Sequence, residues 1–101
     1  MAAKPLTEQE IDRALTGLSG WTAEDGRLVR GYGMPNHLAA VALLVHIASI
    51  QEELNHHADL TVTYDRVGVS VTTHSAGGRL TDLDVRLAGR IEEIAPAHGA
   101  V

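Results

Sequence analysis

Two short runs of alternating apolar and polar residues, 60–64 and 67–71, constrain the fold of this chain more than any other feature. Their apolar members are Leu60, Val62, Tyr64, Val67, Val69 and Val71. A period of two is typical of strands with one buried face. A turn centred on Asp65 and Arg66 would pair Tyr64 with Val67, Val62 with Val69 and Leu60 with Val71. The pattern therefore predicts an antiparallel hairpin with all of its apolar side chains on one face, although a loop of odd length would shift the pairing by one.

Three histidines flank this hairpin. His56 and His57 precede the first run, and His74 follows the second. The same register, extended outward, sets His57 opposite His74, where directly opposed Cβ atoms are roughly 4.5–5.5 Å apart. Imidazole is the side chain that can both give and take a proton near neutrality. The spacing predicts an acid/base site at the open end of the hairpin.

The rest of the chain supplies three helices and a second hairpin. Thr7 to Glu10 is a capping-box pattern, which predicts a short helix ending near Gly17 or Gly20. Asp25-Gly26 is a strong hairpin turn within 21–33, and a long helix follows from His37 to about Leu54. Thr81 and Pro96 bound a third helix. We expect an α+β fold in the order α-β-β-α-β-β-α, a four-stranded antiparallel sheet with helices packed on one face.

The composition excludes several classes of protein. The 101 residues show no internal linker, so 1–101 is expected to be a single domain with flexible termini at 1–5 and 97–101. The net charge of −5 disfavours direct binding to nucleic acid or to anionic membranes. There is no cysteine, and residues 1–5 lack the apolar core of a signal peptide. The apolar stretch 38–50 is too short for a membrane span, and we expect a soluble, cytoplasmic protein.

The long helix is apolar around more than one face. One set is Leu38, Val41, Ala42, Val45 and Ala48, and another is Leu44, Ile47 and Ile50. One face can cover the sheet, and the other needs a second partner. The pattern favours a homodimer or homotetramer over the alternative, a deeply buried helix in a monomer.

An ordered set of residues extends over nearly the whole chain. The set is Glu52, His56, His57, Ala58, Asp59, Tyr64, Thr73, His74 and Asp84. In this order and on this plan of elements, the chain closely resembles the pterin-4a-carbinolamine dehydratase family. It departs from the family pattern at Ala58, where proline is most frequent, at Leu60, where an aromatic is frequent, and in the long helix, which lacks the usual phenylalanines.

The resemblance implies an activity and a set of site residues. Family members dehydrate a 4a-hydroxy-tetrahydropterin to the quinonoid dihydropterin, which recycles tetrahydrobiopterin; the pterin is the substrate, and no cofactor is required. The catalytic acid/base residues implied are His56, His57 and His74. The substrate-binding residues implied are Glu52, Ala58, Asp59, Thr73, Ser75 and Ala76. Asp84 suits a helix cap, so we favour a structural role for it over catalysis.

Other functions stay open at this point. Three histidines could hold zinc with one open position, but adjacent histidines on an extended backbone point apart, and no fixed metal-binding spacing appears. The family resemblance also admits a non-catalytic dimerisation cofactor that acts through the long helix. A third possibility is an intact site with a different pterin as substrate.

Overall fold

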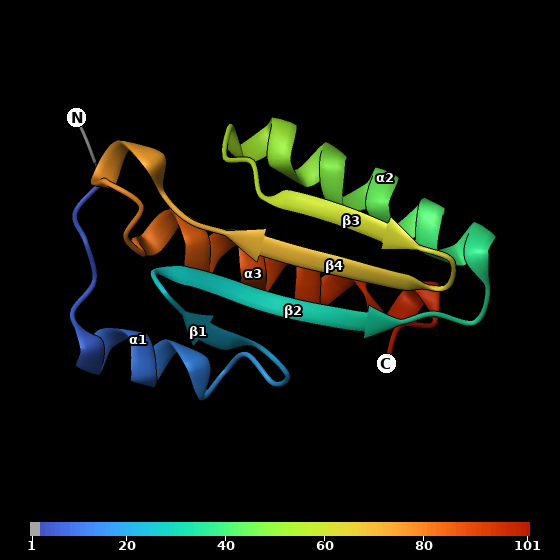
Figure 1. Cartoon of the computed structure of the whole chain (residues 1–101), viewed down its shortest axis with the longest axis horizontal. Coiled ribbons are helices and arrows are strands. Elements are labelled where there is room, and N and C mark those ends of the chain that lie inside the picture. Colours follow the sequence, from blue (N-terminus) through green and yellow to red (C-terminus); the bar gives the residue numbers. More distant parts are fainter. Residues whose placement is uncertain (1–2) are drawn as a thin grey trace.

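The core of the architecture is one antiparallel sheet. The computed structural model describes residues 3–101, and its strands β1 (Thr22–Glu24), β2 (Arg27–Gly33), β3 (Asp59–Thr63) and β4 (Arg66–Val71) lie in the order β1-β2-β4-β3. The helices α2 (His37–Leu54) and α3 (Asp82–Ile94) pack against one face, and α1 (Glu8–Leu15) lies beside β1 (Figure 1). The α+β fold and the order α-β-β-α-β-β-α are confirmed.

Local capping signals set the starts of two helices. The Thr7 hydroxyl accepts from the amide of Glu10, and the Glu10 carboxylate accepts from the amide of Thr7, which completes the predicted capping box of α1. Thr81 and Asp84 form the same reciprocal pair at the start of α3. The helix α1 ends at Leu15, before the predicted glycines.

The first hairpin has the predicted turn. Asp25 and Gly26 both have positive φ, +51° and +77°, and they join β1 to β2 with Glu24 opposite Arg27. Two positive φ values match the right-handed twist of the flanking strands, and for that reason Asp-Gly is favoured here.

The predicted register of the second hairpin is wrong by two residues. Val62 pairs with Val67 and Leu60 with Val69, because the turn consists of Tyr64 and Asp65. A shift of two leaves every side chain on the same face, so the apolar face survives while the partners change. Tyr64 does not join that face: it has φ +52° and its side chain is 72% exposed.

Contacts with the start of α2 explain where this turn forms. The carbonyl oxygen of Asp65 accepts from the amide of Met34 at 2.8 Å, and that of Tyr64 lies 2.7 Å from Nδ1 of His37. These contacts satisfy two carbonyl groups of the turn with partners about 30 residues away in the sequence. The local sequence of the hairpin therefore does not reveal where the turn forms. In the observed register His57 is not opposite His74, since pairing begins at Asp59 and would align His57 with Thr72.

One apolar cluster fills the space between the sheet and the two long helices. The fully buried side chains at its centre are Leu28, Tyr32, Leu43, Ile47, Val67, Val69, Val71, Leu87 and Ile91. At its margin, Glu92 of α3 accepts from the Trp21 indole at 2.8 Å and from the Tyr32 hydroxyl at 2.5 Å. Burial raises the pKa of Tyr32, and the nearby Glu92 carboxylate raises it further.

The C-terminal segment is joined to the sheet. After α3, a short 3-10 helix, η2 (Pro96–His98), leads to Val101, which exchanges two backbone hydrogen bonds with Gly33. These bonds attach Val101 to the end of β2, and the flexibility of 97–101 stays a prediction. Of the predicted flexible segment 1–5, residues 1 and 2 lie outside the described residues.

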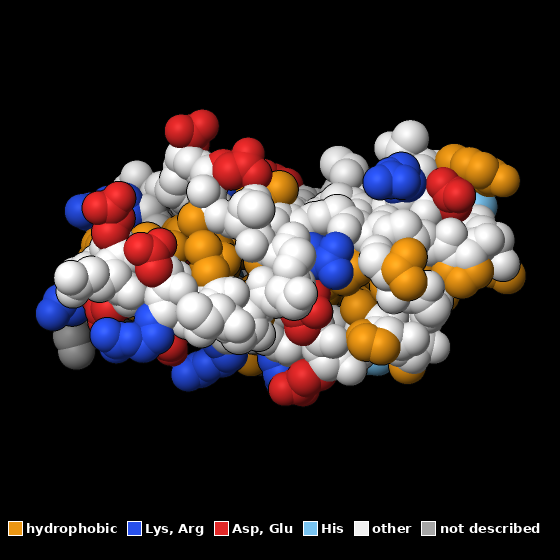
Figure 2. Space-filling view, turned by 90° about the horizontal axis from the view of Figure 1, so that it is seen from below, with side chains coloured by type: hydrophobic (Ala, Val, Ile, Leu, Met, Phe, Trp, Pro, Cys, Tyr) orange, Lys and Arg blue, Asp and Glu red, His pale blue; other side chains and the backbone are white. Residues whose placement is uncertain are grey.

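The helix α2 has one buried face and one apolar face that stays exposed. Ala40, Leu43, Ile47 and Ile50 are buried, whereas Leu38 is 78% exposed and Val45 62% exposed. Figure 2 shows apolar side chains at the end of the molecule where α2 begins, and Lys and Arg interspersed with Asp and Glu elsewhere. By length and composition α2 would also pass as a membrane span, as the core helix of a globular fold can, but it packs on the sheet.

Candidate active site

The predicted site residues gather at one end of the sheet. There α2 ends, β4 runs out into the 3-10 helix η1 (His74–Ala76), and α3 begins (Figure 1). The end of α2 is far in sequence from the start of α3, and a buried network of hydrogen bonds connects the two.

Asp84 is the centre of that network. Its carboxylate is fully buried, and its Oδ1 lies 2.7 Å from Nε2 of His56, whose side chain is 11% exposed. Oδ2 accepts from the Thr73 hydroxyl at 2.7 Å and from the Thr81 amide at 2.8 Å. A carboxylate accepts and does not donate, so the proton between the two side chains belongs to Nε2 of His56. In the neutral imidazole, Asp84 therefore sets the tautomer of His56 and leaves its Nδ1 as an acceptor.

Two buried threonines complete the network. The Thr73 hydroxyl donates its one proton to Asp84 and so accepts from the Thr81 hydroxyl, 2.7 Å away. The residues are 2% and 0% exposed. Throughout residues 3–101, every buried side-chain nitrogen and oxygen has a hydrogen-bonding partner. A satisfied buried network of this kind holds its members in a single arrangement.

His57 is held from the end of α2. Its Nε2 lies 2.6 Å from Oε2 of Glu52, and its side chain is 50% exposed. The helix stops at Asn55, which has a left-handed φ of +51°, and the loop is then secured by Gln51, whose side-chain oxygen accepts from the amide of Ala58 at 2.8 Å. The adjacent histidines thus point to different carboxylates.

His74 is exposed and, among residues 3–101, lacks a carboxylate partner like those of His56 and His57. It begins η1, its side chain is exposed, and within the described part of the chain its imidazole has no hydrogen-bonding partner. Ser75 beside it is exposed and Ala76 is buried. Gly77 and Gly78 follow with φ of +72° and +75°, conformations that favour glycine.

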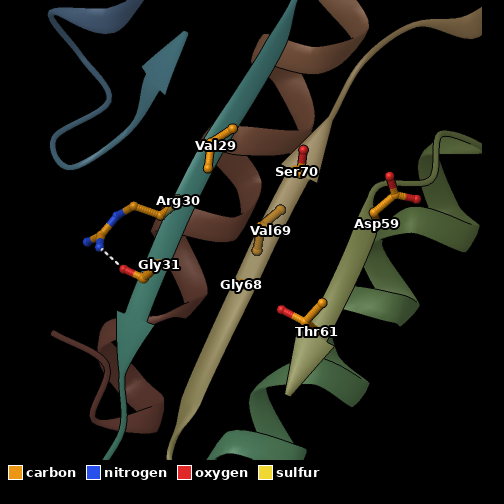
Figure 3. A pocket seen from close by; sticks show the side chains of 8 residues that line it. All are labelled: Val29, Arg30, Gly31, Asp59, Thr61, Gly68, Val69 and Ser70. Atoms are coloured by element: carbon orange, nitrogen blue, oxygen red, sulfur yellow. Dashed lines mark hydrogen bonds between the residues drawn. The ribbon is translucent and has the colours of Figure 1, made fainter. Parts of the chain in front are cut away.

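Asp59 lies on the other face of the sheet. Its Oδ2 is 2.5 Å from a guanidinium nitrogen of Arg27, and its side chain is 76% exposed. A shallow hollow of about 320 Å³ on this outer face is lined by Asp59 and by residues of β2, β3 and β4 (Figure 3). No histidine lines it, so we assign the candidate site to the histidine end rather than to this hollow.

The structure thus connects His56, Asp84 and Thr73 directly, and places His57, Glu52 and His74 on the adjoining segments. Sequence reasoning missed Gln51, although its position four residues after Ile47 puts a polar side chain on the buried face of α2. Among residues 3–101, no three His, Asp or Glu side chains are grouped to hold a metal ion.

Comparison with known proteins decides the family. The family model described as pterin 4 alpha carbinolamine dehydratase matches residues 4–94. The chain belongs to this family. A Streptomyces coelicolor protein named "Putative pterin-4-alpha-carbinolamine dehydratase" is 51% identical over 100 residues, covering 99% of each chain. A Metallosphaera sedula protein of the same name is 42% identical and covers 88% of this chain and 92% of its own.

Solved structures agree with this assignment. A crystal structure titled transcriptional coactivator/pterin dehydratase, from Brucella melitensis, superposes with a TM-score of 0.86 at 32% identity, over 91% of this chain and 99% of that one. A pterin dehydratase-like protein identified as a RuBisCO assembly factor in the α-carboxysome superposes with a TM-score of 0.60 at 16% identity, over 74% of this chain and 86% of that one, which shows a shared fold alone. Family and names together support pterin carbinolamine dehydratase activity at the level of the family.

Proposed function

We propose that this protein dehydrates a 4a-hydroxy-tetrahydropterin to the quinonoid dihydropterin and water, in the recycling of tetrahydrobiopterin. The observation that carries the proposal is the set of three histidines at one end of the sheet, with His56 locked to the buried Asp84. Membership of the family supports the substrate class.

The reaction needs two proton transfers. The 4a-hydroxyl receives a proton and leaves as water, while the ring nitrogen beside it gives up a proton and forms the new double bond to C4a. Imidazoles held at different places can do both without any other group. His57 and His74 are the exposed members and would meet the pterin most directly, and His56 presents Nδ1 from a fixed ring.

The remaining predicted residues would bind and orient. Glu52 accepts from His57 and so fixes that ring. The Thr73 hydroxyl is occupied in the buried network, and its backbone N–H and carbonyl are bonded to Arg79, Ala76 and Gly78. Thr73 would therefore orient the segment, and Ser75 and Ala76 would contact the pterin. Gly77 and Gly78 leave open space beside this segment, which allows a flat ring to approach the backbone.

The test is the rate of dehydration of chemically generated 4a-hydroxy-tetrahydropterin, followed by ultraviolet absorbance with chelator present. We expect turnover that survives chelation and falls in His56→Ala and in His74→Ala. Loss of turnover on chelation alone would favour a metal-dependent site. No turnover from a folded protein, with several pterins offered, would contradict the proposal.

The exposed apolar face of α2 supports a second proposal, that the protein self-associates through this face as a dimer or tetramer. Leu38, Val41 and Val45 follow one another at helical spacing, and exposed Tyr64 lies at the same end beside His37. A monomer rarely leaves such large apolar side chains together in water. Light scattering coupled to gel filtration gives the oligomeric state, and a monodisperse monomer would contradict this proposal.

The same face favours one alternative function, a binding module in which α2 contacts another protein and the histidines are idle. The two functions are separable by variants. Histidine substitutions should abolish dehydration and spare partner binding, whereas Val45→Gln should do the reverse.

A further inference from the structure

The β1–β2 turn, Asp25 and Gly26, lies with Arg27 at the start of β2 against the segment that carries His74. The Thr72 hydroxyl, which is buried, donates to the carbonyl oxygen of Gly26 at 2.7 Å. A Cβ placed on Gly26 would overlap the carbonyl oxygen of Gly78, so the two backbones approach as closely as glycine permits. The turn therefore contacts the His74 segment both before and after the histidine.

The same turn also reaches the segment that carries His56 and His57. Arg27 crosses β4: its Nε donates to the Ser70 hydroxyl at 2.6 Å and its Nη2 to the Asp59 carboxylate at 2.5 Å. Asp59 is the second residue after His57. Two consecutive residues, Gly26 and Arg27, thus contact both halves of the candidate site.

These contacts lie just where the strand pairing ends. The last pair between β3 and β4 is Asp59 with Ser70, the two residues that Arg27 joins. Beyond that pair, His57 on one side and the residues from Thr72 to His74 on the other have no β3–β4 hydrogen bonds to set their separation. A displacement of about 1 Å at a catalytic group can cost 10²-fold in rate, so such cross-links matter for catalysis.

We infer that Gly26 and Arg27 are positioning residues, which act with the Asp84 network to set the distance between the His56-His57 segment and the His74 segment. The inference rests on the proposed dehydratase function and deepens it. Neither residue touches the substrate, and each acts through another: Arg27 through Asp59, and Gly26 through the backbone that follows His74.

The kinetic test compares Arg27→Ala with a matched control, Arg90→Ala. Arg90 also donates two hydrogen bonds to one carboxylate, that of Glu53, at 2.5 and 3.2 Å, but among residues 3–101 it has no hydrogen bond or ion pair with a residue of the candidate site. We expect Arg27→Ala to lower kcat by ~10-fold or more with KM changed less than threefold, as positioning effects predict. Arg90→Ala should retain the wild-type kcat.

Two further variants separate positioning from loss of charge. Arg27→Lys keeps a cation near Asp59 but not the fork that joins Asp59 to Ser70, so its kcat should lie between those of wild type and Arg27→Ala. Because Arg27 acts through Asp59, adding Asp59→Asn to Arg27→Ala should cause no further loss.

A measurement independent of turnover keeps the inference testable if the proposed function fails. Imidazole and amide resonances, observed by nuclear magnetic resonance, should shift at His57 and Ala58 in Arg27→Ala and at Gly77 and Gly78 in Gly26→Ala, and should not shift in Arg90→Ala. A wild-type protein without turnover would contradict the dehydratase proposal, and the resonances alone would then decide the inference. Wild-type kcat and unshifted His57 resonances in Arg27→Ala would overturn it.

Discussion

Replacing Asp84 by Asn tests the network that holds the site. The change keeps the shape of the side chain but turns one acceptor oxygen into an NH₂ donor, in a place where three donors converge. The amide oxygen can face either His56 or the pair formed by the Thr73 hydroxyl and the Thr81 amide. Facing the pair keeps two of the three hydrogen bonds, so the amide oxygen takes that side and the NH₂ points at Nε2 of His56.

This arrangement forces a change of tautomer. Nε2 of His56 must accept rather than donate, so its proton moves to Nδ1, the nitrogen that we propose for the reaction. The three bonds to a charged acceptor become bonds to a neutral amide, and each weakens by about 1 kcal/mol. We therefore expect the free energy of unfolding to fall by about 3 kcal/mol, and the dehydration rate by roughly 10²-fold.

Urea unfolding, followed by the fluorescence of Trp21, the one tryptophan of the chain, measures the first effect. Asp82→Asn is the matched control, because Asp82 lies in the same first turn of α3 but is 77% exposed and 3.6 Å from Arg86. It should cost less than about 1 kcal/mol. A loss of stability in Asp84→Asn no greater than in the control, or an unchanged dehydration rate, would show that the Asp84 network does not hold the site.

Three other predictions follow from the same structure. His74→Ala should lower the dehydration rate by at least ~10²-fold, and a smaller loss in the ultraviolet assay would mean that His74 is not catalytic. Stability should be unchanged, because the imidazole is exposed and has no hydrogen-bonding partner in residues 3–101. The double change Leu38→Gln with Val45→Gln should lower the mass seen by light scattering, whereas an unchanged mass would exclude this face as the interface. Burial and Glu92 raise the pKa of Tyr32 above its ordinary value of 10.0, so the stability that its protonated hydroxyl contributes is complete below pH 10 and is lost as the pH rises further. Tyr32→Phe should therefore reduce the fall in the free energy of unfolding at alkaline pH. Denaturant titrations in which the variant and the wild type lose stability equally would contradict this assignment.

Local signals in the sequence were sufficient for much of the fold. The capping boxes at Thr7 and Thr81 and the Asp25-Gly26 turn are each defined within a few residues, so their elements appear where the sequence predicts them. The long helix His37–Leu54 is likewise indicated by local features, its continuous helical periodicity and the cap at Asn36.

The register of the second hairpin could not be predicted in the same way. A period-two pattern is unchanged by a shift of two, so the apolar residues cannot distinguish a turn at Asp65-Arg66 from one at Tyr64-Asp65. The choice depends on Met34 and His37, which bind the turn carbonyls from another part of the chain. The same reason hides the pairs of His56 with Asp84 and of Arg27 with Asp59, which join residues 28 and 32 positions apart.

The most direct test of histidine catalysis is the rate at which the wild-type protein, with chelator present, dehydrates chemically generated 4a-hydroxy-tetrahydropterin. The rate is measured beside those of His56→Ala and His74→Ala, each of confirmed fold. We expect turnover in the wild type and losses of at least ~10²-fold in both variants. Turnover that is equal in all three proteins, or absent from a well-folded wild type, would contradict histidine catalysis at this site.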